Sequence, residues 1–257
     1  MKLIDLSIGY PQGKSSRVVM KGINAELHKG RLTCLIGANG AGKSTLLRTI
    51  SAFQPKLGGD IIIRGRKLES FSREELARLI GVVLTERPSV QHLTARQMVA
   101  MGRSPYTGFF GRLSDEDNAV VTESLRMVGI EHLAERMVHS LSDGERQKMM
   151  TAKALAQQTD VIFLDEPTAF LDYGSKVDTL QMLHQLCNVE GKTILLSTHD
   201  LELALQVAEE LWVMTDDKVT TGTPDELSAD GTLSRFIDRP GLHYDPTART
   251  IRIVDNK

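Results

Sequence analysis

Residues 37–44 read Gly37-Ala38-Asn39-Gly40-Ala41-Gly42-Lys43-Ser44 and fit the pattern G-x-x-x-x-G-K-[ST] at every position. The apolar residues 31–36 precede them and predict a short buried strand, and a helix is expected over residues 43–52. Glycines let the backbone curl so that successive N–H groups point at phosphate oxygens, and the helix adds the positive end of its dipole. The octapeptide therefore predicts a cradle for the phosphates of a nucleoside triphosphate.

Individual side chains of this segment are expected to bind different parts of the nucleotide and its metal ion. Lys43 would bridge the β- and γ-phosphates, and the hydroxyl of Ser44 would bind Mg²⁺. A glycine-rich turn that merely joins a strand to a helix is the alternative, and the complete pattern in this context argues against it. The expected nucleotide-binding set is Gly37, Asn39, Gly40, Ala41, Gly42, Lys43, Ser44 and Thr45.

A second segment supplies acidic groups at the end of another predicted strand. Residues 161–164 are all apolar, which predicts a buried strand, and Asp165 and Glu166 follow directly. Asp165 would hold Mg²⁺ through water, and Glu166 would take a proton from the attacking water. Taken alone, the pair could be two solvated carboxylates that end a strand, but the phosphate cradle favours the catalytic interpretation.

Alternation of strands and helices predicts an α/β fold with a largely parallel sheet. We expect a P-loop NTPase core of the RecA-like type, an N-terminal antiparallel β subdomain around a Pro11-Gln12-Gly13 loop, and an inserted α-helical subdomain at about 86–150. Strands are expected at 3–8, 18–27, 31–36, 60–64, 80–84, 161–164, 193–196 and 211–214, with a further candidate at 250–254. Helices are expected at 43–52, 73–79, 115–128, 144–158 and 173–189, and one more after Gly222.

Helix starts carry their own signals. Ser72 is followed by Glu75, which predicts a capping box, and Ser114 is expected to cap the helix that follows it. For the helix at 144–158, either Ser142 or Asp143 could be the cap. A capped helix start is also a potential anion site.

Composition excludes several classes of protein. The 257 residues carry 31 Lys and Arg against 33 Asp and Glu, so no basic footprint for nucleic acid is present. Cys34 and Cys187 lie in apolar surroundings and are expected to be buried reduced thiols. No apolar run is long enough to span a membrane, and the first residues lack the apolar core of a signal peptide. We expect an intracellular protein that serves a membrane only by docking.

The segment Leu141-Ser142-Asp143-Gly144-Glu145-Arg146-Gln147 makes the sequence resemble the ABC ATPases, the nucleotide-binding subunits of ABC transporters. Their signature reads L-S-G-G-Q, so Asp143 and Glu145 depart from it, while Ser142 and Gly144 keep the two positions that contact the γ-phosphate in the family. The distance along the chain from Ser142 to Asp165 also matches the distance found in the family. The resemblance implies that Ser142, Gly144 and Glu145 bind nucleotide.

Further positions follow the family pattern in order. Residues 169–172 resemble the D-loop, whose Asp172 would lie at the subunit boundary and near nucleotide. Residues 197–200 resemble the switch-histidine loop, which implies that His199 contacts the γ-phosphate and orients water. Tyr10 matches the aromatic residue that stacks on adenine. The resemblance makes residues 1–238 the ATP-binding domain and 239–257 a short C-terminal tail.

One position departs from the family. A glutamine that reaches Mg²⁺ usually follows the strand that here ends near Leu84, but the chain reads Thr85-Glu86. Either side chain could take that place. The hydroxyl of Thr85 is a shorter ligand, and the anionic Glu86, which we favour, would bind Mg²⁺ more strongly.

The resemblance also implies cofactors and partners: ATP and Mg²⁺, a second copy packed head to tail, and transmembrane permease subunits at the cytoplasmic face of the inner membrane. Residues 93–99 and the segment Gly102-Arg103-Ser104-Pro105-Tyr106 resemble importers of ferric siderophores, haem and cobalamin, which act with a periplasmic substrate-binding protein. An ABC-type ATPase not coupled to transport is the alternative. A P-loop kinase is disfavoured, because it has no use for residues 141–147 or His199.

Overall fold

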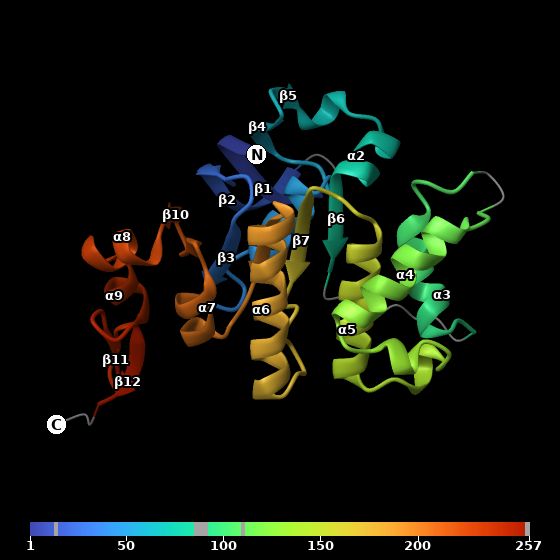
Figure 1. Cartoon of the computed structure of the whole chain (residues 1–257). Coiled ribbons are helices and arrows are strands. Elements are labelled where there is room, and N and C mark those ends of the chain that lie inside the picture. Colours follow the sequence, from blue (N-terminus) through green and yellow to red (C-terminus); the bar gives the residue numbers. More distant parts are fainter. Residues whose placement is uncertain (13–14, 85–91, 109–110, 255–257) are drawn as a thin grey trace. The chain divides into compact units, whose positions relative to one another are not determined.

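The computed structural model describes residues 1–12, 15–84, 92–108 and 111–254 (Figure 1). The chain divides into two compact units. The first unit comprises Met1–Ser70 and Leu195–Lys257, and the second comprises Phe71–Ile194. Strand β8 (Thr193–Ser197) runs from the second unit into the first.

The N-terminal part of the first unit is an antiparallel sheet with the order β2-β1-β4-β5. The expected loop at Pro11 is wrong, because Pro11 and Gln12 belong to β1 and pair with Ser16 and Ser15. β4 pairs only with the first half of β1, so Pro11 lies at an open edge, where a missing N–H is tolerated. The strands are β1 (Lys2–Gln12), β2 (Ser15–Glu26), β4 (Gly58–Ile63) and β5 (Arg66–Lys67).

The first unit also holds the strand that leads to the phosphate cradle. β3 (Leu32–Gly37) is buried along its whole length and pairs in parallel with β9 (Glu210–Met214). This parallel pair confirms the expected α/β core. β10 (Val219–Gly222) adds an antiparallel edge that was not predicted. The helices of this part are α1 (Lys43–Ile50) and α7 (Leu201–Val207).

The C-terminal part of the first unit contains more structure than the sequence indicated. Instead of one helix there are α8 (Pro224–Ala229) and α9 (Thr232–Ile237), separated at Gly231, which adopts a positive φ of 75°. The strand expected near residue 250 is confirmed as β12 (Thr250–Ile253), and it pairs with β11 (Leu242–Asp245). Tyr244 is fully buried, so this hairpin is packed rather than a loose tail.

The second unit combines a parallel strand pair with a group of helices. β6 (Ile80–Val83) and β7 (Val161–Asp165) run parallel, as expected. The helices α3 (Ala95–Ala100), α4 (Asp115–Met127) and α5 (Asp143–Ala156) lie side by side (Figure 1) around an apolar core that includes Val99, Leu125 and Met149. Three short 3₁₀ turns join them: Met101–Arg103, Glu131–Leu133 and Val138–Ser140. The remaining helices are α2 (Arg73–Leu79) and α6 (Tyr173–Glu190), and η1 (Leu68–Ser70) belongs to the first unit.

The capping predictions are confirmed at Ser72 and Ser114, each of which forms a capping box with the third residue of its helix. Ser142, and not Asp143, caps α5. Boxes at Thr94 and Thr223 were not predicted. Cys34 and Cys187 are both buried thiols, as expected. Among the described residues, no helix combines the length and apolarity needed to cross a bilayer.

The start of α4 carries an acid-sensitive group. The backbone N–H and the hydroxyl of Ser114 donate to one carboxylate oxygen of Asp117, and Arg103 Nε donates to the other at 2.8 Å. These bonds, that of the Ser114 N–H first, lower the pKa of Asp117 to about 2. Because the folded-state pKa is depressed, the stabilisation is complete above pH ~4 and is lost as the pH falls toward 2.

We predict that Asp117→Asn lowers the unfolding temperature at pH 7 and makes stability less dependent on pH below 4, since the variant has no carboxylate to protonate. Thermal unfolding followed by circular dichroism between pH 7 and 3 measures both effects. Asp115→Asn, on the same helix turn but exposed, is the control. A pH profile of Asp117→Asn parallel to that of the wild type would contradict the assignment.

Candidate functional site

The phosphate cradle lies in the first unit between β3 and α1. Lys43 is buried, and its ammonium donates to the carbonyl oxygens of Gly37 at 2.8 Å and Ala38 at 3.1 Å. These bonds fold the side chain back onto the start of the loop, so its charge lies beside residues 37 and 38. Asn39 and Gly40 are exposed on this loop, while Ala41 and Ser44 are partly buried. The positive charge is therefore fixed beside an accessible backbone.

Two glycines of the cradle are required by close packing. A Cβ atom at Gly37 would lie 2.6 Å from the carbonyl oxygen of Met214 on β9. At Gly42, φ is 109°, and a Cβ would lie 2.6 Å from Cγ1 of Val19 on β2. Side chains rarely adopt such a φ, and these contacts leave no room for one. The loop can thus take this course only with glycine at both positions.

The start of α1 is arranged to receive an anion. Gly42 is the N-cap residue, and within the described part of the chain no side chain caps this helix. The first N–H groups of a helix have no partner inside the helix, and they lie at the positive end of its dipole. A phosphate group is the partner that this geometry and charge favour.

Tyr10 lies over the first turn of α1. Its hydroxyl forms a 2.9 Å hydrogen bond with Oγ1 of Thr45, and the residue is 40% exposed. Thr45 itself is buried. The contact brings β1 and the cradle helix together, so Tyr10 and Thr45 both belong to the same site in the first unit.

His199 also belongs to the first unit, in the loop between β8 and α7. The backbone N–H of Thr198 donates to the carbonyl oxygen of Leu35 on β3 at 3.2 Å. Since β3 leads into the cradle, this bond fixes the His199 loop beside the strand that carries it. His199 is exposed.

The acidic pair lies in the second unit. Asp165 is fully buried as the last residue of β7. Glu166 follows with a φ of 53°, and its carbonyl oxygen accepts hydrogen bonds from the N–H of Ala169 and from Nε2 of Gln147 at 3.2 Å. A left-handed conformation in a non-glycine residue costs of order 1–2 kcal/mol and persists only where its surroundings hold it. The bond from Gln147 is one such support.

The start of α5 is a closed capping box. The N–H of Glu145 donates to Ser142 Oγ at 3.2 Å, and the N–H of Ser142 donates to Oε2 of Glu145 at 2.7 Å. Hydrogen bonding to the Ser142 N–H lowers the pKa of the Glu145 carboxyl. Glu145 is therefore an anionic cap of its own helix, and its carboxylate and the Ser142 side chain lie together at the start of α5.

A pocket of about 510 Å³ opens beside this helix start. Its wall includes Ser142, Gly144, Phe170 and Asp172. A Cβ at Gly144 would lie 3.1 Å from the carbonyl oxygen of Phe170, so the two segments approach closely. Asp172 caps α6 by accepting from the N–H and the hydroxyl of Ser175, and these bonds lower its pKa.

The structure thus gathers the predicted residues into two sets. The first unit holds the cradle, Tyr10 and His199, and the second holds Asp165, Glu166 and the wall of the pocket. Thr85 and Glu86 lie outside the described residues. Gln147 was not predicted as a functional residue, although it ends the quoted signature segment. The signal that could have identified it was an amide side chain in the second turn of the capped helix.

Comparison with known proteins gives a family for the chain. Residues 20–169 match the family described as ABC transporter. The ferric enterobactin transport ATP-binding protein FepC of Escherichia coli is 35% identical over 251 residues, which cover 97% of this chain and 91% of FepC. The cobalamin import ATP-binding protein BtuD of Halobacterium salinarum is 35% identical over 238 residues, covering 92% of this chain and 59% of BtuD. The chain belongs to the ABC transporter family.

Solved structures of the ABC cassette MJ0796 have the same fold. Its dimeric structure superposes with a TM-score of 0.78 at 27% identity, covering 87% of this chain and 98% of that one. A second structure, of a post-hydrolysis state with ADP and Pi, has a TM-score of 0.76. The predicted P-loop NTPase fold is confirmed, and the chain is an ABC-type ATPase that binds and hydrolyses ATP.

We predict that Gly42→Ala weakens ATP binding at least about tenfold, because the side chain collides with Val19 and strains the loop. Titration with a fluorescent ATP analogue measures the affinity. Gly65→Ala is the control, since Gly65 has a φ of 77° but no neighbour within 4 Å. Equal ATP affinities in the two variants would contradict the requirement for glycine at position 42.

We predict that Gly144→Ala lowers the rate of ATP hydrolysis more than tenfold and leaves ATP binding within twofold. The added methyl group would press against the carbonyl of Phe170 and distort the pocket wall. Steady-state phosphate release and nucleotide titration separate the two quantities. In the control Gly174→Ala the nearest atom is 3.4 Å away, and hydrolysis should be unchanged. Normal hydrolysis by Gly144→Ala contradicts a role for this wall.

Proposed function

We propose that this ABC ATPase energises the import of a metal complex, an iron complex (ferric siderophore or haem) or cobalamin, through a partner permease. One observation carries the ATPase part of the proposal: a single chain holds both a phosphate cradle at α1 and a capped helix start at α5 that borders an open pocket. Relatives named for ferric enterobactin and cobalamin support this choice of cargo. Residues 93–99 and 102–106, which resemble such importers, support it as well.

The cradle binds the triphosphate of ATP. Backbone N–H groups of residues 37–43 and the start of α1 contact the phosphates, and Lys43 leaves its carbonyl partners to bridge the β- and γ-phosphates. The ring of Tyr10 stacks on adenine. Asn39, Gly40, Ala41 and Thr45 complete the loop around the nucleotide.

Mg²⁺ fits the oxygen donors that the chain offers. The Ser44 hydroxyl in the first turn of α1 and the buried carboxylate of Asp165 are hard oxygen ligands of the kind that Mg²⁺ accepts, and these two residues would hold the cation. When bound, it neutralises charge on the phosphates. Glu86, or Thr85, would add a further oxygen.

Hydrolysis requires a base and an orienting group. Glu166 accepts the proton of the attacking water, which contributes about 10²–10⁴-fold to the rate. His199 hydrogen-bonds to the γ-phosphate and orients the water. Gln147 donates to the backbone carbonyl of Glu166 and so supports its strained turn.

Each ATP is shared by two copies of the chain, packed head to tail. The cradle of one copy holds the nucleotide, and the Ser142 hydroxyl and Gly144 N–H of the other contact its γ-phosphate. Asp172 lies at the boundary between the copies, and Glu145 shapes the helix start. The dimeric structure of MJ0796 supports this arrangement.

The dimer acts at the cytoplasmic face of the cell membrane as a peripheral subunit. Closure on ATP and opening after hydrolysis drive transmembrane permease subunits, which receive cargo from a periplasmic substrate-binding protein. Nucleic acid is not a partner. Co-purification with a permease tests this assignment, and an ATPase that isolates with ribosomes or DNA would be the alternative, uncoupled kind.

We predict that Glu166→Gln abolishes steady-state ATP hydrolysis, retains ATP binding and produces a stable ATP-bound dimer, because the amide cannot accept a proton but keeps the shape of the site. Phosphate release and size-exclusion chromatography with ATP are the measurements. Glu123→Gln, an exposed carboxylate on α4, is the control and should behave as the wild type. Unchanged turnover in Glu166→Gln removes it as the base.

A further inference from the structure

The segment Gly102-Arg103-Ser104-Pro105-Tyr106 has no task in the proposed reaction, yet Arg103 is only 5% exposed. Its guanidinium makes three hydrogen bonds of 2.8 Å: Nε donates to Asp117, and Nη1 donates to the carbonyl oxygen of Ala156 and to Oε1 of Gln158. Ala156 is the last residue of α5, and Asp117 lies in the first turn of α4. Arg103 therefore ties the end of one helix to the start of another.

Tyr106 adds a second tie to the same helix end. Its hydroxyl donates to the carbonyl oxygen of Gln157 at 2.9 Å, and the Arg103 guanidinium stacks on its ring at 4.2 Å from the centroid. Arg78 of α2 donates to the carbonyl oxygen of Pro105 through both Nε and Nη2. The segment thus binds the carbonyl groups that α5 leaves without partners at its C-terminus.

The backbone of the segment is pressed against α5. A Cβ at Gly102 would lie 2.3 Å from the carbonyl oxygen of Lys153, so only glycine allows this approach. The side chain of Gln157 donates in turn to the carbonyl oxygens of Ala77 and Ile80. The C-terminal end of α5 is therefore joined to α2, to β6 and to the start of α4.

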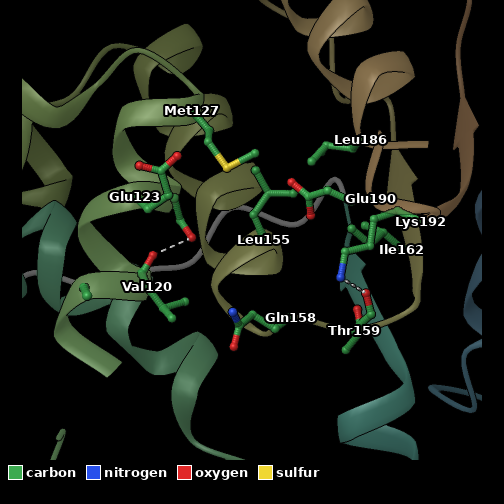
Figure 2. Close-up of a pocket in the computed structure, with 12 residues that line it drawn as sticks. Val120, Glu123, Met127, Leu155, Gln158, Thr159, Ile162, Leu186, Glu190 and Lys192 are labelled. Carbon is green, nitrogen blue, oxygen red and sulfur yellow. Dashed lines mark hydrogen bonds between the residues drawn. The ribbon is translucent and has the colours of Figure 1, made fainter. Parts of the chain in front are cut away.

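A cavity borders the same end of α5. Leu155, Gln158 and Thr159 line a cavity of about 350 Å³ that also borders α4 and α6 (Figure 2). Close packing is interrupted there. The middle of α5 packs against α3 and α4 through Met149 and Ala152, and Arg103 and Tyr106 supply the polar contacts that hold its C-terminal end. We call these contacts, with Gly102, Asp117 and Gln157, the α5 anchor.

We infer that Arg103 and Tyr106 are positioning residues for ATP hydrolysis: by fixing the C-terminal end of α5 they aim its other end, Ser142–Gly144, at the ATP held by a second copy. The inference rests on the proposed function. α5 has 14 residues and is about 21 Å long. A tilt of about 5° at the anchor would displace Ser142 by about 2 Å, and a misplacement of 1 Å can cost about 10²-fold in rate.

The test uses the full chain with Glu166→Gln, in which ATP-driven dimer formation is followed by size-exclusion chromatography. Adding Arg103→Lys keeps the charge, but a single ammonium cannot replace the three-way fork. We expect the ATP concentration for half-maximal dimer formation to rise at least about tenfold. ATP affinity at protein concentrations too low for dimers should stay within twofold, because the cradle lies in the other unit.

Two further variants make the result specific. Tyr106→Phe removes only the bond to Gln157 and should raise the ATP concentration for half-maximal dimer formation about fivefold. If Arg103→Lys fails to fold, Tyr106→Phe tests the positioning role in its place. Arg126→Lys is the control, since Arg126 pairs with Glu123 on the exposed face of α4, and it should leave that ATP concentration unchanged.

The outcomes separate the inference from the function on which it rests. The positioning role is overturned if the ATP concentration for half-maximal dimer formation in both anchor variants stays at the value of Glu166→Gln alone. It is also overturned if the ATP affinity of the monomer falls by the same factor as dimer formation, because that would indicate general destabilisation. Failure of Glu166→Gln itself to form a dimer with ATP contradicts the proposed function instead.

Discussion

The structure of the site depends on the close approach of backbone to backbone at the phosphate cradle. Gly37 lies against the carbonyl of Met214, and Gly42 turns the chain at a positive φ against Val19. Only this course leaves the first N–H groups of α1 pointing outward beside the buried Lys43. The parallel pair β3 and β9 places Met214 against Gly37, so the shape of the phosphate-binding loop depends on how the first unit is packed.

Helix termini carry much of the remaining chemistry. Ser142, Ser114 and Asp172 each satisfy N–H groups at a helix start through a side-chain oxygen. At α5 the cap has two tasks, because the Ser142 hydroxyl both closes the capping box and is our proposed contact to phosphate. The C-terminus of the same helix is bound by Arg103. Helix α5, whose N-terminus we propose contacts ATP, is thus held by hydrogen bonds at both its N-terminus and its C-terminus.

Much of this was accessible from the sequence because the signals are local. The strand and helix around residues 37–44, the apolar strand before Asp165, the Ser72 capping box and the Ser114 cap each depend on residues close together in the chain, and all of these elements are confirmed. The roles of Tyr10, His199, Glu166 and the signature residues remain predictions. Gln147 was missed because its bond to Glu166 joins residues 19 apart in sequence. The buried state of Arg103 was missed because a charged side chain in a loop is normally solvated.

The sequence by itself determined the order and type of most elements, the place of the cradle in the chain and most of the helix starts, since these follow from spacing, apolar periodicity and the steric freedom of glycine. Only the tertiary structure decided which distant groups meet. It extended β1 through Pro11 at an open edge, packed residues 242–253 as a hairpin, and brought Arg103 to the end of α5. Such contacts depend on loop closure and side-chain packing across many residues, and no local pattern encodes them.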